Sequence, residues 1–230
     1  MSIISDFIGL FFPSVCEACG NLLFKNESTL CTRCLVRLPK TNFHSFADNP
    51  VSETFWGRVN IYSAASFLYY SKAGMVQQMI HNFKYHRKTD VGKVLGRMYA
   101  ADLIKSPLFA DVQVLMPVPL HWTKLKKRGF NQSEIIANAM APGMNLPMET
   151  QVLIRRFATD TQTKKSRIKR SENVSGKFAL ENQERIVGKH ILLIDDVITT
   201  GATLEECVGL LLTVEGVKVS VASLGFAGKA

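Results

Sequence analysis

The sequence predicts an α/β protein with a doubly wound, mainly parallel sheet and a small cysteine-containing module at its amino terminus. From residue 59 onward, apolar segments of strand length alternate with segments of helical periodicity, and this alternation favours parallel strands joined by crossover helices. Residues 191–194 are four branched apolar residues in succession, as in a strand that is buried on both faces. With 47% hydrophobic and 20% charged residues, the chain has the composition of an ordinary globular protein.

The first fifteen residues predict a short amphipathic helix. Their apolar side chains fall at helical spacing, at Ile3, Ile4, Phe7, Ile8 and Phe11. Docking of this helix on the rest of the protein is the first interpretation, and weak attachment to a membrane surface is the alternative. We do not expect a secretory signal, because Asp6 interrupts the apolar run and there is no basic leader or small-residue cleavage site. No apolar run in the sequence reaches the length of a membrane span.

Four of the five cysteines form two C-x2-C pairs, Cys16 with Cys19 and Cys31 with Cys34. Each pair can place two thiolates on one ion from a tight turn, and the second pair completes a tetrahedron. We expect structural zinc here, since the sequence is not that of a small secreted scaffold held by disulfides. Disulfides and a redox pair are the alternatives. Cys207 lies on the apolar face of a predicted helix and is expected to be a buried, inert thiol.

The chain is predicted to have three parts. Residues 1–38 hold the amino-terminal helix and the cysteine module, residues 39–58 form an irregular linker with two prolines and a glycine, and residues 59–230 form the main domain. Within the main domain the sequence predicts, in order, a strand (59–70), two helices (about 75–83 and 91–105), a strand (112–118), a helix (131–141), a long loop (156–175), a short strand (176–180), a strand from 191, a helix (204–214) and a last strand (217–224).

The segment 191–203 combines a buried strand, two carboxylates and a threonine-rich turn. Asp195 and Asp196 would stand at the carboxyl end of the strand, where open α/β sheets hold their ligands. The turn leads into a helix, whose unpaired N–H groups and partial positive charge favour an anion. Since carboxylates do not favour phosphate, their expected partner is a sugar diol. The pattern therefore indicates a ribose 5-phosphate site, and a strand, acidic turn and helix cap without chemistry is the alternative.

Positive charge is concentrated in one part of the sequence. The formal net charge is +9, and residues 121–170 hold eleven Lys or Arg against three Asp or Glu, a net of +8. The block opens with a Pro-rich turn at residues 117–121 that is followed by several cations beside Gly129. Such a turn suits an oxyanion, and the field of the whole block would attract polyanions, including nucleic acid. A solvated loop is the alternative.

The segment 191–203 resembles the signature of the type I phosphoribosyltransferases, which bind phosphoribosyl pyrophosphate (PRPP). Further motifs extend the resemblance over nearly the whole chain to the competence protein F (ComF) family of phosphoribosyltransferase-like proteins. These motifs are Phe12-Pro13, the two cysteine pairs, Phe83-Lys84-Tyr85, Pro117-Val118-Pro119-Leu120, Arg128-Gly129-Phe130-Asn131-Gln132, Thr161-Gln162 and Arg170 to Asn173. The resemblance implies a type I phosphoribosyltransferase fold, a zinc-binding amino-terminal element and involvement in DNA uptake during natural transformation.

The resemblance also implies roles for individual residues. Asp195 and Asp196 would be the catalytic pair that holds the ribose hydroxyls. The 5-phosphate would be wrapped by Thr199, Thr200, Gly201, Ala202 and Thr203. Pyrophosphate would be bound by main-chain groups and side chains at Leu120, His121, Lys124 and Arg128, with Mg2+ bridging pyrophosphate and ribose oxygens. For His121, a general base and a hydrogen-bonded structural histidine both stay open.

Three functions are compatible with these observations. The first is an active phosphoribosyltransferase with an unidentified acceptor, and the second is a PRPP-binding protein that does not catalyse, since a ligand site does not guarantee turnover. The third is a single-stranded DNA-binding factor that uses residues 121–170 as a basic track. The expected partners are PRPP, single-stranded DNA and other DNA-uptake proteins. The expected location is the cytoplasm, with peripheral attachment to the inner face of the membrane as the alternative.

Overall fold

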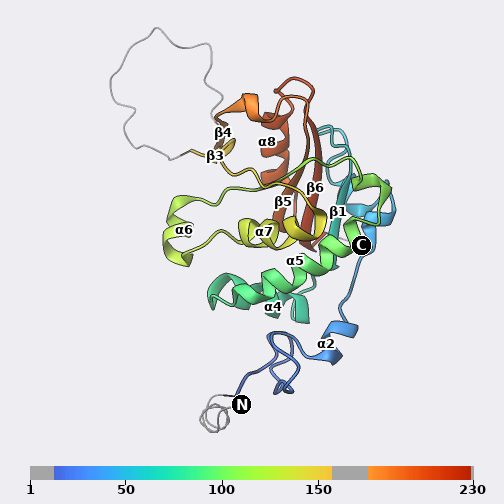
Figure 1. Cartoon of the computed structure of the whole chain (residues 1–230), viewed down its shortest axis with the longest axis vertical. Helices are drawn as coiled ribbons and strands as arrows, with labels where there is room; N and C mark the ends of the chain where they lie inside the picture. The colour runs from blue at the N-terminus through green and yellow to red at the C-terminus, as the bar shows by residue number, and fades with distance from the viewer. Residues whose placement is uncertain (1–12, 157–175, 229–230) are drawn as a thin grey trace.

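The computed structural model describes residues 13–156 and 176–228 (Figure 1). Its centre is a four-stranded sheet of β1 (Ala64–Tyr69), β2 (Val114–Pro117), β5 (His190–Ile198) and β6 (Lys218–Phe226). The strand order is β1-β6-β5-β2, and each neighbouring pair is parallel. The predicted doubly wound, mainly parallel sheet is confirmed.

Four helices build the layers on this sheet: α4 (Met75–Tyr85), α5 (Thr89–Leu103), α7 (Gln132–Met144) and α8 (Ala202–Leu211). The connection from β1 to β2 and the connection from β5 to β6 run in opposite directions along the sheet, so right-handed crossovers place their helices on opposite faces. Accordingly α5 and α7 pack against each other and α7 covers β2 and β5, while α8 contacts β5 and β6. β2 and the first half of β5 are apolar and buried because both of their faces are covered.

The cysteine module, residues 13–38, lies below α4 in Figure 1 and ends in the short helix α2 (Thr32–Val36). Glu17 fastens it to the domain, because the Asn82 side chain donates to the Glu17 backbone oxygen (3.1 Å) and carboxylate (3.0 Å). Lys88 forms an ion pair with the same carboxylate at 2.9 Å. The module thus contacts the last turn of α4, the helix whose carboxyl-terminal end lies at the edge of the sheet.

The expected linker, residues 39–58, folds against the sheet. It contains η1 (Phe43–Ser45) and α3 (Pro50–Glu53), and the side chains of Val51 and Phe55 are fully buried. Asn49 caps α3 and also donates from Nδ2 to the Ala64 oxygen at 2.9 Å. The segment is therefore packed structure beside β1, and the division of the chain into three parts stays a prediction.

Several elements differ from the sequence prediction. The lysine-rich turn is a helix, α6 (Trp122–Arg128), and the short strand β4 (Phe178–Leu180) pairs antiparallel with an unpredicted strand, β3 (Leu153–Arg155). The first strand begins at Ala64 rather than at residue 59. The structure also contains the short 3-10 helices η2 (Pro107–Phe109) and η3 (Gln183–Arg185). The expected amino-terminal helix and the expected loop at residues 156–175 lie almost wholly outside the described residues.

None of the helices in the described part of the chain has both the length and the apolar character needed to cross a membrane.

Candidate functional site

The two aspartates lie near the carboxyl end of β5, and each has a defined partner. Asp195 Oδ1 accepts hydrogen bonds from Ser133 Oγ at 3.0 Å and from the backbone N–H of Asp196 at 2.8 Å. Lys84 Nζ lies 2.9 Å from both carboxylate oxygens of Asp196. Ser133 comes from the first turn of α7 and Lys84 from the last turn of α4, so three separate elements meet at this edge of the sheet.

The environment of Asp195 disfavours its ionised form. Burial, together with the negative charge of Asp196, raises the pKa of Asp195 to about 7. Three contacts lower the pKa of Asp195 without cancelling this rise: the Asp196 N–H, the Ser133 hydroxyl and the Lys84 charge. Near neutral pH the aspartate pair therefore carries less than its full double charge, and Lys84 compensates part of what remains.

The threonine turn after β5 forms a cradle at the start of α8. Thr199 and Thr200 are exposed, and Gly201 has a positive φ of 73°, which a residue with a side chain seldom adopts. The N-cap residue Gly201 has no side chain to cap α8, and the Ala202 N–H makes only a long contact with Thr200 Oγ1 at 3.5 Å. An anion can therefore compete for the N–H groups of the first turn. Asp195 lines the same concavity as residues 199–204. The threonine turn with the start of α8 and a carboxylate therefore share one hollow.

Arg58 supports the cradle from outside. Its guanidinium donates to the backbone oxygens of Thr200 (2.8 Å) and Thr54 (3.0 Å) and pairs with the Glu205 carboxylate. Glu205 lies in the first turn of α8. The arginine thus ties the turn and the helix that follows it to the segment 54–58.

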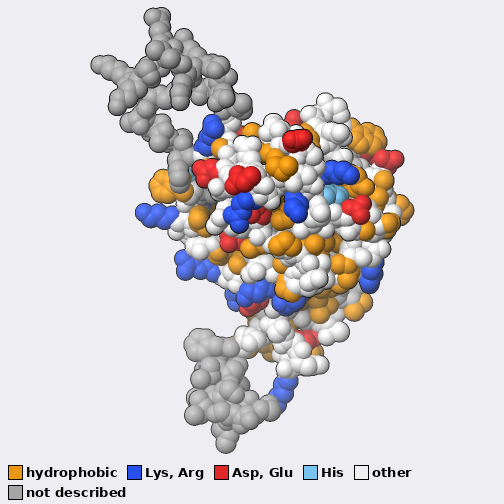
Figure 2. All heavy atoms as spheres, turned by 45° about the horizontal axis from the view of Figure 1, so that its top comes forward, with side chains coloured by type: hydrophobic (Ala, Val, Ile, Leu, Met, Phe, Trp, Pro, Cys, Tyr) orange, Lys and Arg blue, Asp and Glu red, His pale blue; other side chains and the backbone are white. Residues whose placement is uncertain are grey.

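A second hollow, which we call the basic pocket, lies between the end of α4 and α6. It is lined by Lys84, Tyr85, Arg87, Lys124, Lys127 and Arg128, a set with five cationic side chains and no carboxylate. Arg128 donates to Gln132 Oε1 at 2.7 Å and lies over the Tyr85 ring, 5.3 Å from its centroid. Figure 2 shows Lys and Arg side chains on the side of the molecule where Figure 1 places α6. The pocket is suited to a multiply charged anion.

The geometry of α6 gives His121 a structural role. His121 is the N-cap of this helix, and its Nδ1 accepts from the Thr123 N–H at 3.3 Å and lies 2.7 Å from Thr123 Oγ1. These contacts agree with the structural alternative for this histidine. His121 and the half-buried Leu120 line neither the cradle concavity nor the basic pocket, so their part in binding pyrophosphate stays a prediction.

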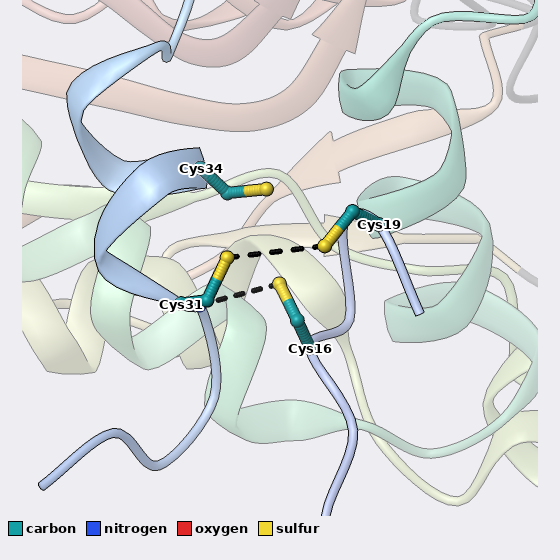
Figure 3. A group of neighbouring side chains, drawn as sticks. All are labelled: Cys16, Cys19, Cys31 and Cys34. Carbon is teal, nitrogen blue, oxygen red and sulfur yellow. Dashed lines mark hydrogen bonds between the residues drawn. The ribbon is translucent and has the colours of Figure 1, made fainter. Parts of the chain in front are cut away.

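The four cysteines of the two pairs point their sulfur atoms toward one another (Figure 3). All four Sγ atoms lie within 4.8 Å of one another, and the Cys19 and Cys31 sulfurs are 3.8 Å apart. Sulfurs bound to tetrahedral zinc at about 2.3 Å are about 3.8 Å apart. The described cysteines are free thiols rather than disulfides. The cluster therefore has the donor set and spacing that a four-coordinate zinc ion requires.

Backbone N–H groups favour the thiolate form of Cys16, whereas burial raises the pKa of Cys34 well above its usual range. Burial alone would raise the pKa of Cys16, but hydrogen bonds from the backbone of Cys31, Ala18 and Cys19 outweigh it and lower the pKa to about 7. The Cys31 N–H lies 3.2 Å from Cys16 Sγ. Glu27 braces the loop between the two pairs, since its carboxylate accepts from the N–H groups of Thr32 and Phe24 at 2.6 and 3.0 Å. Such outer contacts hold metal ligands in position.

Comparison with known proteins identifies the domain and relatives of the chain. Residues 130–228 match the family model described as phosphoribosyl transferase domain. The chain is 27% identical over 202 residues to the DNA utilization protein YhgH of Escherichia coli (strain K12), covering 86% of this chain and 84% of that protein. It is 29% identical over 147 residues to Competence protein F of Haemophilus influenzae, covering 61% and 64%. The chain thus contains a phosphoribosyl transferase domain and is a homologue of these two proteins.

One of the solved structures that this chain resembles is glutamine PRPP amidotransferase from B. subtilis, complexed with ADP and GMP. The match covers 61% of this chain and 30% of that chain at 22% identity, with a TM-score of 0.42. This similarity is too low to carry an argument about the site.

The structure gathers most of the predicted site residues into two hollows. Asp195 and residues 199–203 share the cradle concavity, and Lys124 and Arg128 share the basic pocket. Sequence analysis assigned no role to Lys84, Ser133 and Arg58. Lys84 stands in the Phe83-Lys84-Tyr85 motif, which was a usable signal, whereas nothing in the sequence marks the contacts of Ser133 and Arg58.

Proposed function

We propose that this protein binds PRPP at the carboxyl edge of its sheet. The observation that carries the proposal is the single concavity that Asp195 shares with the threonine turn and the start of α8. The carboxylates of Asp195 and Asp196 would accept hydrogen bonds from the ribose hydroxyls. The 5-phosphate would lie on the N–H groups and hydroxyls of Thr199, Thr200, Gly201, Ala202 and Thr203. Its negative charge would face the positive end of the α8 dipole.

The pyrophosphate of PRPP would occupy the basic pocket. Lys124 and Arg128 line it, as does Lys84, whose ammonium contacts Asp196. The pocket thus adjoins the proposed ribose site, as the linkage of pyrophosphate to ribose C1 requires. Backbone groups near Leu120 and His121 would complete the pyrophosphate contacts. Mg2+, when bound with PRPP, would supply further neutralisation of the pyrophosphate charge.

This arrangement also suits transfer of the phosphoribosyl group. In such a transfer the bond from C1 to the pyrophosphate oxygen breaks, a bond from C1 to the acceptor forms, and the acceptor releases a proton. The protein would contribute by fixing the sugar and by neutralising the departing pyrophosphate, without a covalent intermediate. The acceptor is not identified by any residue of the site.

Calorimetric titration with PRPP and Mg2+ tests the proposal. We compare the wild-type chain with the Asp195→Asn, Asp196→Asn double variant and with Asp90→Asn, in which an exposed carboxylate outside both hollows is changed. The double variant should bind PRPP at least tenfold more weakly, because it replaces charged acceptors of hydroxyl hydrogen bonds by neutral ones, and Asp90→Asn should bind like the wild type. Equal affinity in all three proteins, or no binding by the wild type, would refute the site.

A second candidate function is the binding of single-stranded DNA during DNA uptake. Two relatives are named for competence and DNA utilization. The observation that favours it here is α6, which has three basic residues in its last turn and no buried residue. Lysine and arginine side chains on an exposed helix track a nucleic-acid backbone. The zinc cluster would serve this function only by holding the amino-terminal module together.

Salt dependence separates the two functions. Lys126 lies on α6 but does not line the basic pocket, so Lys126→Gln should weaken binding of a single-stranded oligonucleotide and leave PRPP affinity unchanged. The slope of log affinity against log salt should fall by about 0.7 for each phosphate contact that is lost. DNA affinity that does not change between low and moderate salt would exclude α6 as a DNA-binding track.

A further inference from the structure

Lys84 links the aspartate pair to the basic pocket. Its Nζ contacts both carboxylate oxygens of Asp196 at 2.9 Å, and its side chain lines the basic pocket together with Lys124 and Arg128. The side chain of Lys84 is 20% exposed and that of Asp196 is 14% exposed. One ammonium group, largely shielded from solvent, is therefore in reach of both the proposed ribose site and the proposed pyrophosphate site.

The packing around Lys84 fixes its backbone and leaves its side chain able to turn. The preceding residue, Phe83, is fully buried, and its ring stacks on Phe130 with the centroids 5.7 Å apart. The hydrogen bond and ion pair described for this lysine are both made by its terminal ammonium, at the end of a four-carbon stem. The stem has rotatable bonds along its whole length, and the basic pocket that the side chain lines lies within its reach.

Arg128 is less free to make such an exchange. Its guanidinium donates to Gln132 Oε1 at 2.7 Å and lies over the Tyr85 ring. Both contacts hold the guanidinium plane in one orientation. Lys84 differs from Arg128 because its partner, the Asp196 carboxylate, is also a proposed ligand of the sugar.

A cation at this position affects the binding of PRPP and the binding of ribose 5-phosphate differently. The ion pair with Lys84 competes with ribose hydroxyls for the oxygens of Asp196, because all of them donate to the same acceptors. Pyrophosphate offers the ammonium a new and more highly charged partner. Lys84 therefore opposes the binding of a ribose phosphate that lacks pyrophosphate and favours one that carries it.

On the basis of the proposed PRPP site, we infer that Lys84 is a specificity-determining residue. Its ammonium moves from Asp196 to the pyrophosphate group as ribose hydroxyls take its place at the carboxylate, and this exchange makes the site prefer PRPP to ribose 5-phosphate.

The test is calorimetric titration of the full chain with PRPP and, separately, with ribose 5-phosphate, each in the presence of Mg2+. Wild type is compared with two neutral variants, Lys84→Gln and Lys84→Met, and with the charge-conserving Lys84→Arg. Lys93→Gln is the matched control, since Lys93 is a helical lysine paired with Asp90 at 2.9 Å that lines neither hollow. Circular dichroism verifies that each variant is folded.

Each neutral variant should bind PRPP at least tenfold more weakly, which is the loss expected for one charge-assisted contact. Ribose 5-phosphate should bind to each neutral variant at least as tightly as to the wild type, so the preference for PRPP should fall by tenfold or more. Lys84→Arg should keep the preference within about threefold, since it keeps the charge, and Lys93→Gln should match the wild type.

Two results would overturn the inference. If Lys84→Gln or Lys84→Met weakens both sugars by the same factor, Lys84 only holds Asp196 in place. If neither affinity changes, Lys84 does not take part in binding. A wild-type chain that binds neither sugar phosphate would instead refute the proposed PRPP site itself, which keeps the two failures distinguishable.

Discussion

The side-chain amide of Asn82 donates to both the backbone oxygen of Glu17 (3.1 Å) and its carboxylate (3.0 Å), and so attaches the cysteine module to α4. Asn82 lies two residues before Lys84, which reaches Asp196 from the same helix. One helix therefore holds the module and contributes to the site, which gives this hydrogen-bonded pair a measurable part in the stability of the whole protein.

We expect Asn82→Ala to lower the free energy of unfolding by about 1–2 kcal/mol, because the Glu17 backbone oxygen and Oε2 lose the Asn82 donor while Lys88 still pairs with Oε1. Zinc content should stay unchanged, since no cysteine is altered. Denaturant unfolding monitored by circular dichroism measures the first quantity and elemental analysis the second. Gln78→Ala is the control, as it removes only an exposed contact with Asn82, expected to contribute at most about 0.5 kcal/mol. Equal stability of wild type and Asn82→Ala would contradict the docking role of Asn82.

The cysteine cluster should hold one equivalent of zinc per chain in protein purified without chelator. Cys19→Ser should abolish stoichiometric zinc, because a closed structural site needs all four thiolates. Cys207→Ala should keep the metal, since Cys207 is buried in α8 away from the cluster. Metal analysis together with thiol titration decides the matter. Protein with almost no zinc and a disulfide between Cys16 and Cys19 would show that the cluster is not a metal site.

The pKa of Asp195 predicts a specific dependence of stability on pH. Because its pKa in the folded protein, about 7, lies above the value of about 3.9 for an unfolded chain, the folded state binds more protons than the unfolded state between these limits. The contribution of Asp195 to stability is therefore fully present below about pH 4 and is lost as the pH rises to about 7.

Asp195→Asn tests this dependence, since the amide oxygen can still accept from Ser133. Relative to wild type, the variant should gain stability between pH 5 and pH 8 by on the order of 1–2 kcal/mol. Taking the difference between the two proteins cancels contributions from other groups that titrate in this range. Unfolding midpoints measured at several pH values provide the data, and a difference that does not vary with pH would show that Asp195 is not perturbed in this way.

The sequence predicted the parts of this structure that follow from apolar patterning. β5 was predictable because its branched apolar run can only be buried on both faces, and α4 because Val76, Met79, Ile80 and Phe83 fall on one side of a helix. α6 could not be found in this way, since it buries no residue. It is defined by local signals instead, the His121 cap at its start and Gly129 with a φ of 84° at its end.

The unpredicted parts of the site depend on tertiary contacts. Lys84 and Asp196 are 112 residues apart in the chain, and their meeting depends on how α4 crosses the sheet edge. The packed segment 39–58 carried a usable signal, Asn49 before Pro50 with Val51 and Phe55 at helical spacing, but its prolines and glycine favoured an irregular linker.

We expect that a side chain at Gly201, the glycine of the cradle, destabilises the protein. A Cβ at this position would lie 2.8 Å from Thr54 Cγ2 and 3.3 Å from the Phe55 ring, and the φ of 73° already disfavours any other residue. Gly201→Ala should therefore lower the free energy of unfolding by about 1–3 kcal/mol. It should also weaken PRPP binding, because the turn must shift away from Phe55.

Gly209→Ala in the middle of α8 is the matched control, since nothing lies within 4 Å of its Cβ position, and it should be neutral or stabilising by up to about 1 kcal/mol. Denaturant unfolding and PRPP titration of both variants measure the two effects. If Gly201→Ala matches Gly209→Ala in both, the tight packing of the turn is not what shapes the cradle.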